Sequence, residues 1–213
     1  MRMLKQRRLV MEFGRKLVTG GLTTGSGGNL SLLDRSQGLL AITPSGVDYF
    51  DITPGQVVLV DLEGRQVDGP GRPSSELGFH LALYRDRPEA TAVVHTHSPY
   101  ATTLACLHWE LPPAHYLVGF AGAKVPLAPY HTYGTPELAQ AVAQTMRGYN
   151  AALLANHGLV AVGNTLPRAF AVAEEVEFAA RVYYQAKTVG QPKILSSKQM
   201  EEVLAKFADY GRQ

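Results

Sequence analysis

A short apolar run that ends in two histidines constrains this sequence more than any other feature. Residues 91–94 read as a buried strand, and His95 and His97 follow it with one residue between them. Because side chains alternate between the two faces of a strand, both imidazoles point to the same side. Their Cα atoms then lie about 6.5 to 7 Å apart, so both rings can reach one metal ion at roughly 2.0–2.1 Å. The pattern predicts part of a metal site, and a third ligand must come from elsewhere in the chain.

The overall composition is that of an ordinary globular protein, and it argues against one class of partner. The chain has 213 residues, of which 46% are hydrophobic and 18% charged. A chain of this length can bury a full core without disulfides. Its 20 basic and 18 acidic residues nearly balance, so nothing in the net charge indicates nucleic-acid binding.

The cysteine content and the start of the chain bear on the compartment and on the ligands available to a metal. The single cysteine, Cys106, excludes an internal disulfide and a cysteine-based zinc site, and its apolar neighbours predict that it is buried. The basic residues 1–8 lead into a segment that Glu12, Arg15 and Lys16 interrupt, which argues against a signal peptide. No run approaches the ~20 apolar residues of a membrane span. We expect a cytoplasmic protein whose metal is bound by histidine and carboxylate.

Hydrophobic periodicity, capping residues and turn residues divide the chain into helices and strands. Helices are expected over residues 2–18, 76–85, 99–107, 135–147, 166–188 and 196–208. Strands are expected over residues 30–33, 38–43, 57–61, 66–67, 91–94, 114–118, 151–155 and 159–162. The expected N-caps are Ser74 or Ser75, Ser98, Thr135 and Ser196, the last in a capping box with Gln199.

The way these elements are joined indicates the fold class. Strands alternate with helices, but short turns join several of the strands directly. This favours an α/β fold with a mixed, mainly antiparallel sheet and helices on both faces over a doubly wound parallel sheet. No linker, repeat or low-complexity segment interrupts the sequence, so residues 1–213 are expected to form a single domain, with a mobile tail from about residue 208.

His157 is the best candidate for the third metal ligand. It lies in the corner Asn156-His157-Gly158, between two short apolar strands. Taken alone, it reads as an ordinary turn histidine. Next to a His-x-His strand end, a ligand is the better interpretation. Three histidines and an open position are typical of catalytic rather than structural zinc, although other divalent ions also accept imidazole.

Glu76 and His80 belong to the helix that follows two serines. An acidic residue in the first turn of a helix is favourable without any catalytic role, because it interacts with the helix dipole. The functional interpretation is a carboxylate at the edge of a cleft, within reach of a metal or of a substrate proton. His80 lies one turn further along the same helix face, and we interpret it as a packing or supporting residue rather than as a ligand.

Three loops rich in glycine and serine are suited to an anion. Residues 25–29, Gly-Ser-Gly-Gly-Asn, offer backbone N–H groups, a hydroxyl and an amide. Ser74 and Ser75 precede a helix, where the positive end of the dipole favours a phosphate. The turn 44–46, Pro-Ser-Gly, adds a third arm. Each pattern is common by itself, and none fits the P-loop pattern.

Together these segments resemble the class II aldolase family. The resemblance is carried, in order and spacing, by residues 25–29, 42–46 (Ile-Thr-Pro-Ser-Gly), 73–76 (Pro-Ser-Ser-Glu), 93–97 (Val-Val-His-Thr-His) and 156–159 (Asn-His-Gly-Leu). It extends from the first helix to the segment 209–211, nearly the whole chain. The combination is specific, whereas each piece is not.

The resemblance implies a three-layer α/β/α fold around a largely antiparallel sheet, and it implies roles for particular residues. His95, His97 and His157 match zinc ligands, and Glu76 matches a catalytic carboxylate that also approaches the metal. Tyr116 and Tyr210 match tyrosines at the aldehyde end of the substrate. The matches to the phosphate pocket are Ser26, Asn29, Ser45, Gly46, Ser74 and Ser75, with serine at 26 and 45 where the family often has threonine.

The activity implied is a metal-dependent, reversible cleavage of a ketose 1-phosphate, of the L-fuculose 1-phosphate type, into dihydroxyacetone phosphate and an aldehyde. The metal implied is Zn²⁺, with another divalent cation as the alternative. The assembly implied is a cyclic homotetramer with the active site at a subunit interface. Neither a nucleic acid nor a membrane is expected as a partner.

Three other functions stay open within the same superfamily. L-ribulose-5-phosphate 4-epimerase has the same histidines but tends to carry Asp where this chain has Glu76, so Glu76 favours the aldolase. A methylthioribulose-1-phosphate dehydratase is a second alternative. The third is a non-catalytic interaction domain like the adducin head, which has lost the metal ligands. That alternative is disfavoured here because the ligands, Glu76 and the anion-binding loops occur together.

Overall fold

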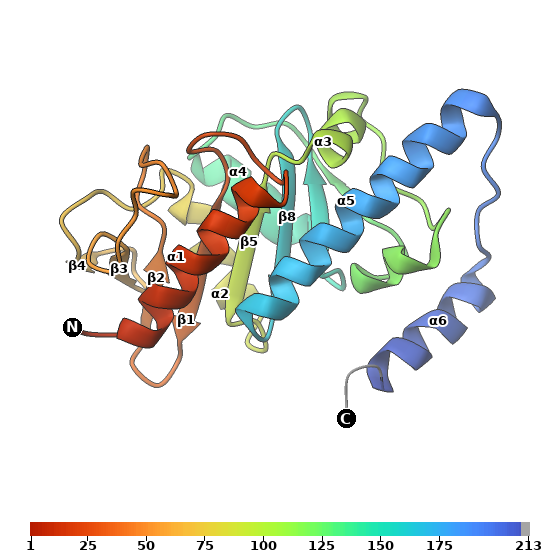
Figure 1. Cartoon of the computed structure of the whole chain (residues 1–213). Helices are drawn as coiled ribbons and strands as arrows, with labels where there is room; N and C mark the ends of the chain where they lie inside the picture. The colour runs from red at the N-terminus through yellow and green to blue at the C-terminus, as the bar shows by residue number, and fades with distance from the viewer. Residues whose placement is uncertain (210–213) are drawn as a thin grey trace.

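One mixed sheet forms the centre of the molecule, and helices cover both of its faces (Figure 1). The computed structural model describes residues 1–209 of the chain. Within this part the strands are β1 (Asn29–Asp34), β2 (Leu39–Ile42), β3 (Val58–Asp61), β4 (Gln66–Asp68), β5 (Ala92–Thr96), β6 (Leu127–Ala128), β7 (Ala151–Leu154) and β8 (Gly158–Gly163). The helices are α1 (Leu4–Thr19), α2 (Leu77–Asp86), α3 (Pro99–Cys106), the 3-10 helix η1 (Tyr116–Phe120), α4 (Pro136–Thr145), α5 (Leu166–Val189) and α6 (Ser197–Asp209).

The sheet has the mainly antiparallel character that the short turns predict. Its strand order is β4-β3-β2-β1-β5-β8-β7-β6. Neighbouring strands are antiparallel, except that β6 pairs with β7 in parallel. The expected α/β class and single domain are confirmed. Strand β5, which carries His95 and leads to His97, lies inside the sheet between β1 and β8.

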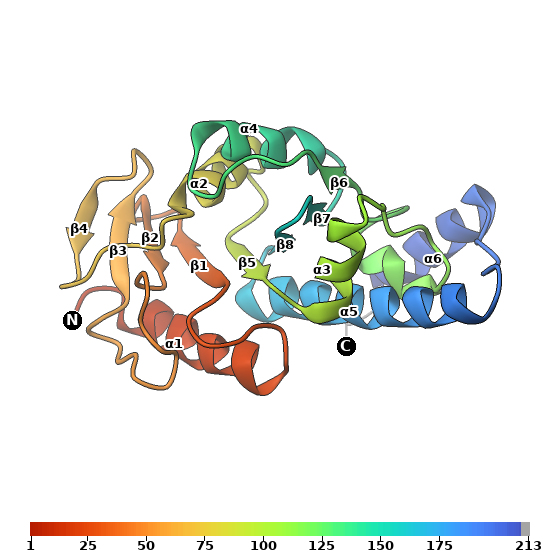
Figure 2. The same cartoon turned by 90° about the horizontal axis from the view of Figure 1, so that it is seen from above.

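Seen from above, the sheet lies between two layers of helices (Figure 2). Helices α1, α3 and α5 pack on one face, and α2 and α4 pack on the other. Strand β5 serves both cores, because Ala92 and Val94 point into the first and Val93 into the second. All five residues of β5 are buried, so its side chains must be apolar or fully partnered. His95 therefore faces the side of the sheet that α2 covers.

One expected strand is wrong. Residues 114–118 do not pair with the sheet but enter η1. His115 is the N-cap of this helix, and its side chain accepts a hydrogen bond from Leu117 N–H. The segment lies under α6, where a Cβ on Gly119 would come within 2.8 Å of the Phe207 ring. Residues of η1 pack against Phe207 and Val203 of α6 rather than against a neighbouring strand.

Three smaller expectations also need correction. Cys106 is exposed rather than buried, because it lies in the last turn of α3. Helix α2 begins one residue later than predicted, with Glu76 at its N-cap, and Ser74 Oγ accepts a hydrogen bond from Glu76 N–H. Ser98 makes no side-chain cap to α3, because its hydroxyl interacts with Thr96 instead.

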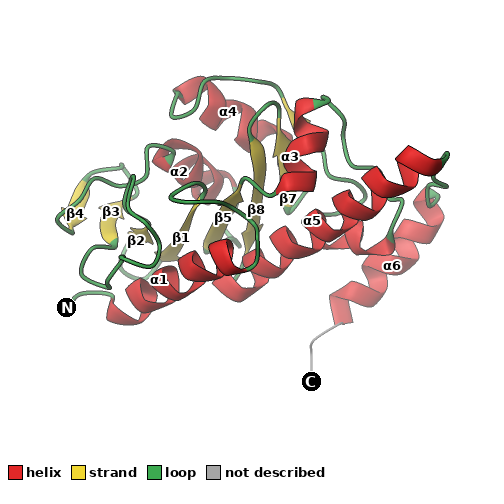
Figure 3. Ribbon diagram, turned by 45° about the horizontal axis from the view of Figure 1, so that its top comes forward, coloured by secondary structure: helices red, strands yellow, loops and turns green. Residues whose placement is uncertain are grey.

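Helix α6 lies outside the layers of the sandwich, next to η1 (Figure 3). Its capping box is confirmed, since Ser196 and Gln199 exchange the expected hydrogen bonds. The tail was expected from about residue 208, but α6 continues to Asp209, and the rest of the expected tail, with Tyr210, lies outside the described residues. None of the helices within residues 1–209 is long and apolar enough to cross a membrane.

Candidate metal centre

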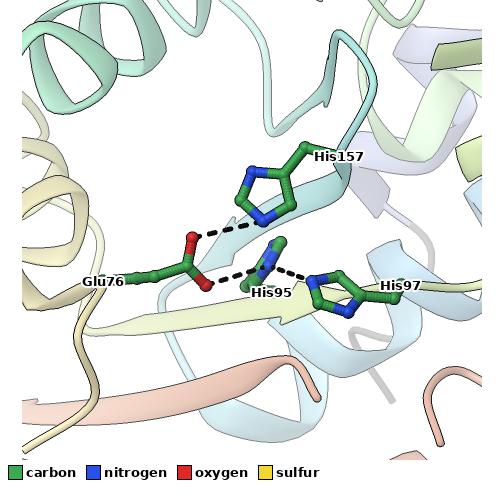
Figure 4. A group of neighbouring side chains, drawn as sticks. All are labelled: Glu76, His95, His97 and His157. Atoms are coloured by element: carbon green, nitrogen blue, oxygen red, sulfur yellow. Dashed lines mark hydrogen bonds and ion pairs between the residues drawn. The ribbon is translucent and has the colours of Figure 1, made fainter. Parts of the chain in front are cut away.

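Four side chains from three separate segments meet at one end of β5 (Figure 4). We call Glu76, His95, His97 and His157 the metal cluster. One ligand atom from each lies within 4.8 Å of all the others. His95 Nε2 is 3.0 Å from His97 Nε2 and 3.2 Å from Glu76 Oε2, and His157 Nε2 is 3.2 Å from Glu76 Oε1. The structure thus brings together the three histidines and the carboxylate expected from the sequence.

The orientation of His95 is set from the neighbouring strand. Its Nδ1 lies 2.9 Å from the carbonyl oxygen of Leu159, which can only accept, so Nδ1 carries the proton. In the neutral ring the other nitrogen, Nε2, is then the unprotonated one, and it faces the cluster in the form that a metal binds. The ring of Phe79 packs edge-on against the imidazole on the α2 side.

Two glycines let the other segments approach the end of β5. A Cβ on Gly158 would come within 2.3 Å of Thr96 O, and one on Gly28 within 2.6 Å of His95 O. Gly28 also has a φ of +65°, a conformation that side chains disfavour. The corner that carries His157 and the loop that ends at Gly28 therefore both pack directly against the strand backbone.

The turn after His97 is anchored by α5. Both carboxylate oxygens of Glu177 accept hydrogen bonds from the first turn of α3, from Tyr100 N–H at 2.9 Å and Ala101 N–H at 2.8 Å. A carboxylate at a helix N-terminus satisfies free N–H groups and interacts favourably with the dipole. This carboxylate provides the cap that was expected from Ser98.

The pKa values of the cluster are set by burial and by the contacts between its members. Burial alone would raise the pKa of Glu76, but His95, His157 and the amide of Asn29 outweigh burial and lower it well below the usual range. Burial would lower the pKa of His95, yet the adjacent Glu76 outweighs it and raises the pKa. Burial and the positive charge on His95 lower the pKa values of His97 and His157 to about 4. Without a metal, one proton is therefore held mainly between His95 and Glu76.

This donor set fits a divalent cation. Four ligands at about 2.0–2.1 Å around a tetrahedral ion are separated by about 3.3 Å, close to the 3.0–3.2 Å contacts seen here. Glu76 Oε1 is buried and has no hydrogen-bond partner among the described residues, although buried carboxylate oxygens normally have one. A metal ion would supply the missing partner.

A cavity of about 360 Å³ opens beside the cluster, and the predicted anion-binding loops line it. The loops are tied to each other, since Ser45 N–H bonds to Arg72 O and Ser74 N–H to Thr43 O. The lining includes Ser26, Asn29, Ser45, Gly46, Ser74 and Ser75 together with Glu76, His97 and His157. All six residues predicted for the phosphate pocket therefore line the same cavity as Glu76, His97 and His157.

The segment before α4 also lines this cavity, although none of its residues was among the predicted site residues. Tyr130, His131 and Tyr133 belong to the lining, and 57% of Tyr130 and 67% of Tyr133 are exposed. The available signal was a run of aromatic and histidine residues directly before the Thr135-Pro136 cap. Aromatic side chains left this exposed at a cavity mouth are suited to contact a ligand.

Tyr116, by contrast, does not reach this cavity. It begins η1, is 49% exposed, and packs near Phe207 and His115. A larger cavity of about 850 Å³ lies between α6 and the segment 108–113, and its lining contains no member of the metal cluster. The smaller cavity is therefore the candidate for substrate binding.

Comparison with known proteins places this site in a family. The model of the "Class II Aldolase and Adducin N-terminal domain" family matches residues 8–184. The chain belongs to the class II aldolase family. It is 50% identical over 209 residues to the 5-deoxy-D-ribulose 1-phosphate aldolase of Bacillus thuringiensis serovar kurstaki, with 98% of each chain covered.

Two further relatives agree with this assignment. The chain is 42% identical to the 5-methylthioribulose-1-phosphate/5-deoxyribulose-1-phosphate aldolase of Rhodospirillum rubrum, covering 95% of this chain and 90% of the relative. A solved structure of an L-fuculose 1-phosphate aldolase superposes with a TM-score of 0.94 at 45% identity, covering 96% of each chain. Class II aldolases are metal-dependent aldehyde-lyases, and the chain has both their fold and a cluster able to hold the metal.

Proposed function

We propose that this chain is a zinc-dependent aldolase that reversibly cleaves a ketose 1-phosphate between C3 and C4, giving dihydroxyacetone phosphate and an aldehyde. The observation that carries the proposal is the position of Glu76. Its carboxylate contacts His95 and His157, lies within 4.8 Å of the ligand atom of His97, and lines a cavity that the three loops predicted to bind an anion also line. A reacting carbon next to a phosphate held in those loops lies within reach of a base.

The three histidines and Glu76 would hold the zinc ion, which when bound acts as a Lewis acid and stabilises the negative charge that develops on the dihydroxyacetone phosphate half. Glu76 transfers the proton at the carbon that carries this charge. The serine hydroxyls and the N-terminus of α2 bind the phosphate and fix the substrate against the cluster. Tyr116 and Tyr210 are proposed to serve the aldehyde oxygen, and the only lysine near mid-chain, Lys124, is paired with Glu110 at the surface.

The names of the relatives narrow the substrate that we propose. Two relatives are named for 5-deoxyribulose 1-phosphate, and one of these also for its methylthio analogue. Cleavage of such substrates between C3 and C4 releases short aldehydes that lack a terminal hydroxyl. We therefore propose a 5-deoxypentulose 1-phosphate as the first substrate to test and L-fuculose 1-phosphate as the second.

A panel of phosphorylated sugars tests the proposed function. Zinc-loaded protein is incubated with 5-deoxyribulose 1-phosphate, methylthioribulose 1-phosphate, L-fuculose 1-phosphate and L-ribulose 5-phosphate. Dihydroxyacetone phosphate is measured enzymatically, and the remaining sugar is examined by NMR. Release of dihydroxyacetone phosphate is the expected result. An epimerised pentulose or a dehydrated methylthio sugar without cleavage would instead support one of the two alternative enzymes.

We also propose a homotetramer whose subunits share active sites. Tyr116 lies away from the cavity of its own chain, and it forms an aromatic surface with His115, Phe178 and Phe207. Exposed aromatic clusters of this kind are typical of interfaces. If Tyr116 serves a neighbouring cavity, co-assembled Glu76→Gln and Tyr116→Phe subunits should regain part of the activity that each variant lacks. No gain on co-assembly would contradict the shared site. Cytoplasmic localisation stays a prediction from the sequence.

A further inference from the structure

The interior side of Glu76 faces a chain of buried polar groups, of which only Asn29 also lines the substrate cavity. Asn29 Nδ2 lies 2.8 Å from Glu76 Oε2, and Asn29 Oδ1 lies 2.6 Å from His80 Nε2. His80 Nδ1 lies 2.7 Å from Ser31 Oγ. We call Asn29, His80 and Ser31 the inner hydrogen-bond chain. At its far end, Tyr84 OH lies 2.7 Å from Ser31 Oγ.

This arrangement follows from one strand face meeting one helix face. Asn29 and Ser31 are two residues apart on β1 and point to the same side. Glu76, His80 and Tyr84 are spaced four residues apart, so they share one side of α2 and its N-cap. The side chains interlock at a depth where none is more than 6% exposed. Polar groups so deep in a protein require complete hydrogen bonding.

The chemistry of the groups determines every proton in the chain. A carboxylate only accepts, so the amide group of Asn29 that faces Glu76 must be its NH₂. Its carbonyl oxygen then faces His80, which must carry its proton on Nε2. Nδ1 of the neutral ring is left as an acceptor, and the Ser31 hydroxyl must donate to it. Burial and the charge on His95 lower the pKa of His80 to about 3, in agreement with a neutral ring.

The opposite tautomer would reverse the whole arrangement. With the proton on Nδ1, an unprotonated Nε2 would face Asn29, and the amide would have to turn its NH₂ toward His80. Its carbonyl oxygen would then lie against the Glu76 carboxylate, where two acceptors repel each other. The direction of the Asn29 amide therefore depends on which nitrogen of His80 holds the proton.

We propose that His80 is a positioning residue for the proposed aldol cleavage. It binds the Asn29 carbonyl oxygen through Nε2–H and the Ser31 hydroxyl through Nδ1, and so keeps the Asn29 NH₂ on Glu76 Oε2. That contact leaves Oε1, the oxygen without a hydrogen bond, directed at the metal cluster. The kinetic consequence rests on the proposed function, whereas the tautomer and the amide direction do not.

Substitutions at His80 test the kinetic part. His80→Leu removes both ring nitrogens, whereas His80→Gln places an amide N–H near the position of Nε2. We expect kcat per bound zinc to fall about 10- to 100-fold in His80→Leu, and to recover most of this loss in His80→Gln. Zinc content and KM for the ketose 1-phosphate should change less than kcat. An unchanged kcat per bound zinc in His80→Leu, with only a lower melting temperature, would show a purely structural role and overturn the proposal.

A gentler pair of variants covers the case in which His80→Leu fails to fold. Ser31→Ala removes the hydroxyl that donates to His80 Nδ1 and leaves that buried nitrogen without a hydrogen bond, so we expect kcat to fall about 2- to 10-fold. Tyr84→Phe is the matched control, because the Ser31 hydroxyl can still donate to His80, so its kcat should stay within about twofold. Equal effects of the two substitutions would contradict the role assigned to Ser31.

The tautomer itself is measured without any activity. In ¹⁵N-histidine-labelled, zinc-loaded protein, NMR should show His80 protonated on Nε2 only. A proton on Nδ1 in the wild-type protein would overturn the proposal. If the wild-type protein cleaves no ketose 1-phosphate, the proposed function fails, and this spectrum still decides the tautomer.

Discussion

His95 and His80 lie on opposite sides of Glu76 and are equally buried, but their pKa values shift in opposite directions. On the side of the metal cluster, His95 lies 3.2 Å from a carboxylate oxygen, and this contact raises its pKa despite burial. On the interior side His80 is just as buried, but the neutral amide of Asn29 stands between it and Glu76, and its pKa falls to about 3. Of these two fully buried histidines, only the one in direct contact with the carboxylate has a raised pKa.

This difference separates two tasks around one residue. The cluster side offers three imidazoles and a carboxylate oxygen that has no hydrogen bond, which is the kind of donor set that a divalent ion requires once the proton shared by His95 and Glu76 has left. The interior side offers a set of hydrogen bonds in which reversing the direction of one would require reversing the others. Substitutions on the cluster side should therefore abolish zinc binding or catalysis, whereas substitutions on the interior side should lower kcat and leave the zinc bound.

The largest effect is expected from His157→Ala. It removes one of three imidazoles, so the remaining groups should not retain stoichiometric zinc, and cleavage should become undetectable. Metal analysis of the dialysed protein and the cleavage assay measure both. A variant that still holds one zinc per chain would refute the three-histidine site.

Glu76→Gln tests the residue that both sides share. The amide keeps the size of the side chain but cannot act as a base, so kcat should fall by about 10²- to 10⁴-fold. Zinc should stay bound, because the three histidines remain. Full activity of the zinc-loaded variant would exclude Glu76 as the group that transfers the proton.

Zinc affinity should depend on pH because of the cluster side. Glu76 raises the pKa of His95, so the metal-free site holds a proton that must leave before Nε2 can bind. We expect the zinc dissociation constant to fall as pH rises, until His95 is deprotonated, and then to level off. A competition titration with a chelator at several pH values measures this, and a flat profile would argue against the coupled pair.

The smallest expected effect concerns stability on the interior side. The pKa of His80 falls from 6.5 in the unfolded chain to about 3 in the folded protein, so between these values only the unfolded chain binds the proton. The stability contributed by the neutral ring is present above about pH 6.5 and is lost as pH falls toward 3, at about 1.4 kcal/mol per pH unit. The stability gap between metal-free wild type and His80→Gln, measured by urea unfolding, should therefore narrow on acidification. A gap that is constant with pH would contradict this.

The metal cluster could be predicted from the sequence because local spacing determines it. Two histidines two residues apart on a strand must share a face. A histidine in the tight turn between two strands must lie where those strands end. The sheet type and most elements followed from similar local signals, such as the Ser196–Gln199 capping box.

The features that were wrong or missed depend on distant parts of the chain. Residues 114–118 resemble a strand locally, but they enter η1, which packs against Phe207 of the distant helix α6. The cap of α3 comes from Glu177, which is 76 residues away from the N–H group of Ala101 that it binds. The contact of Asn29 with His80 joins residues 51 apart, and no periodicity indicates such a pair.

The most direct test of the central claim is to remove and restore the metal while measuring one reaction. The zinc-loaded protein is assayed for release of dihydroxyacetone phosphate from 5-deoxyribulose 1-phosphate and L-fuculose 1-phosphate, then treated with EDTA, dialysed, assayed again and reloaded with Zn²⁺. We predict one zinc per chain, loss of cleavage with loss of the metal, and recovery on reloading. Undiminished cleavage by protein shown by metal analysis to contain no metal would contradict the account.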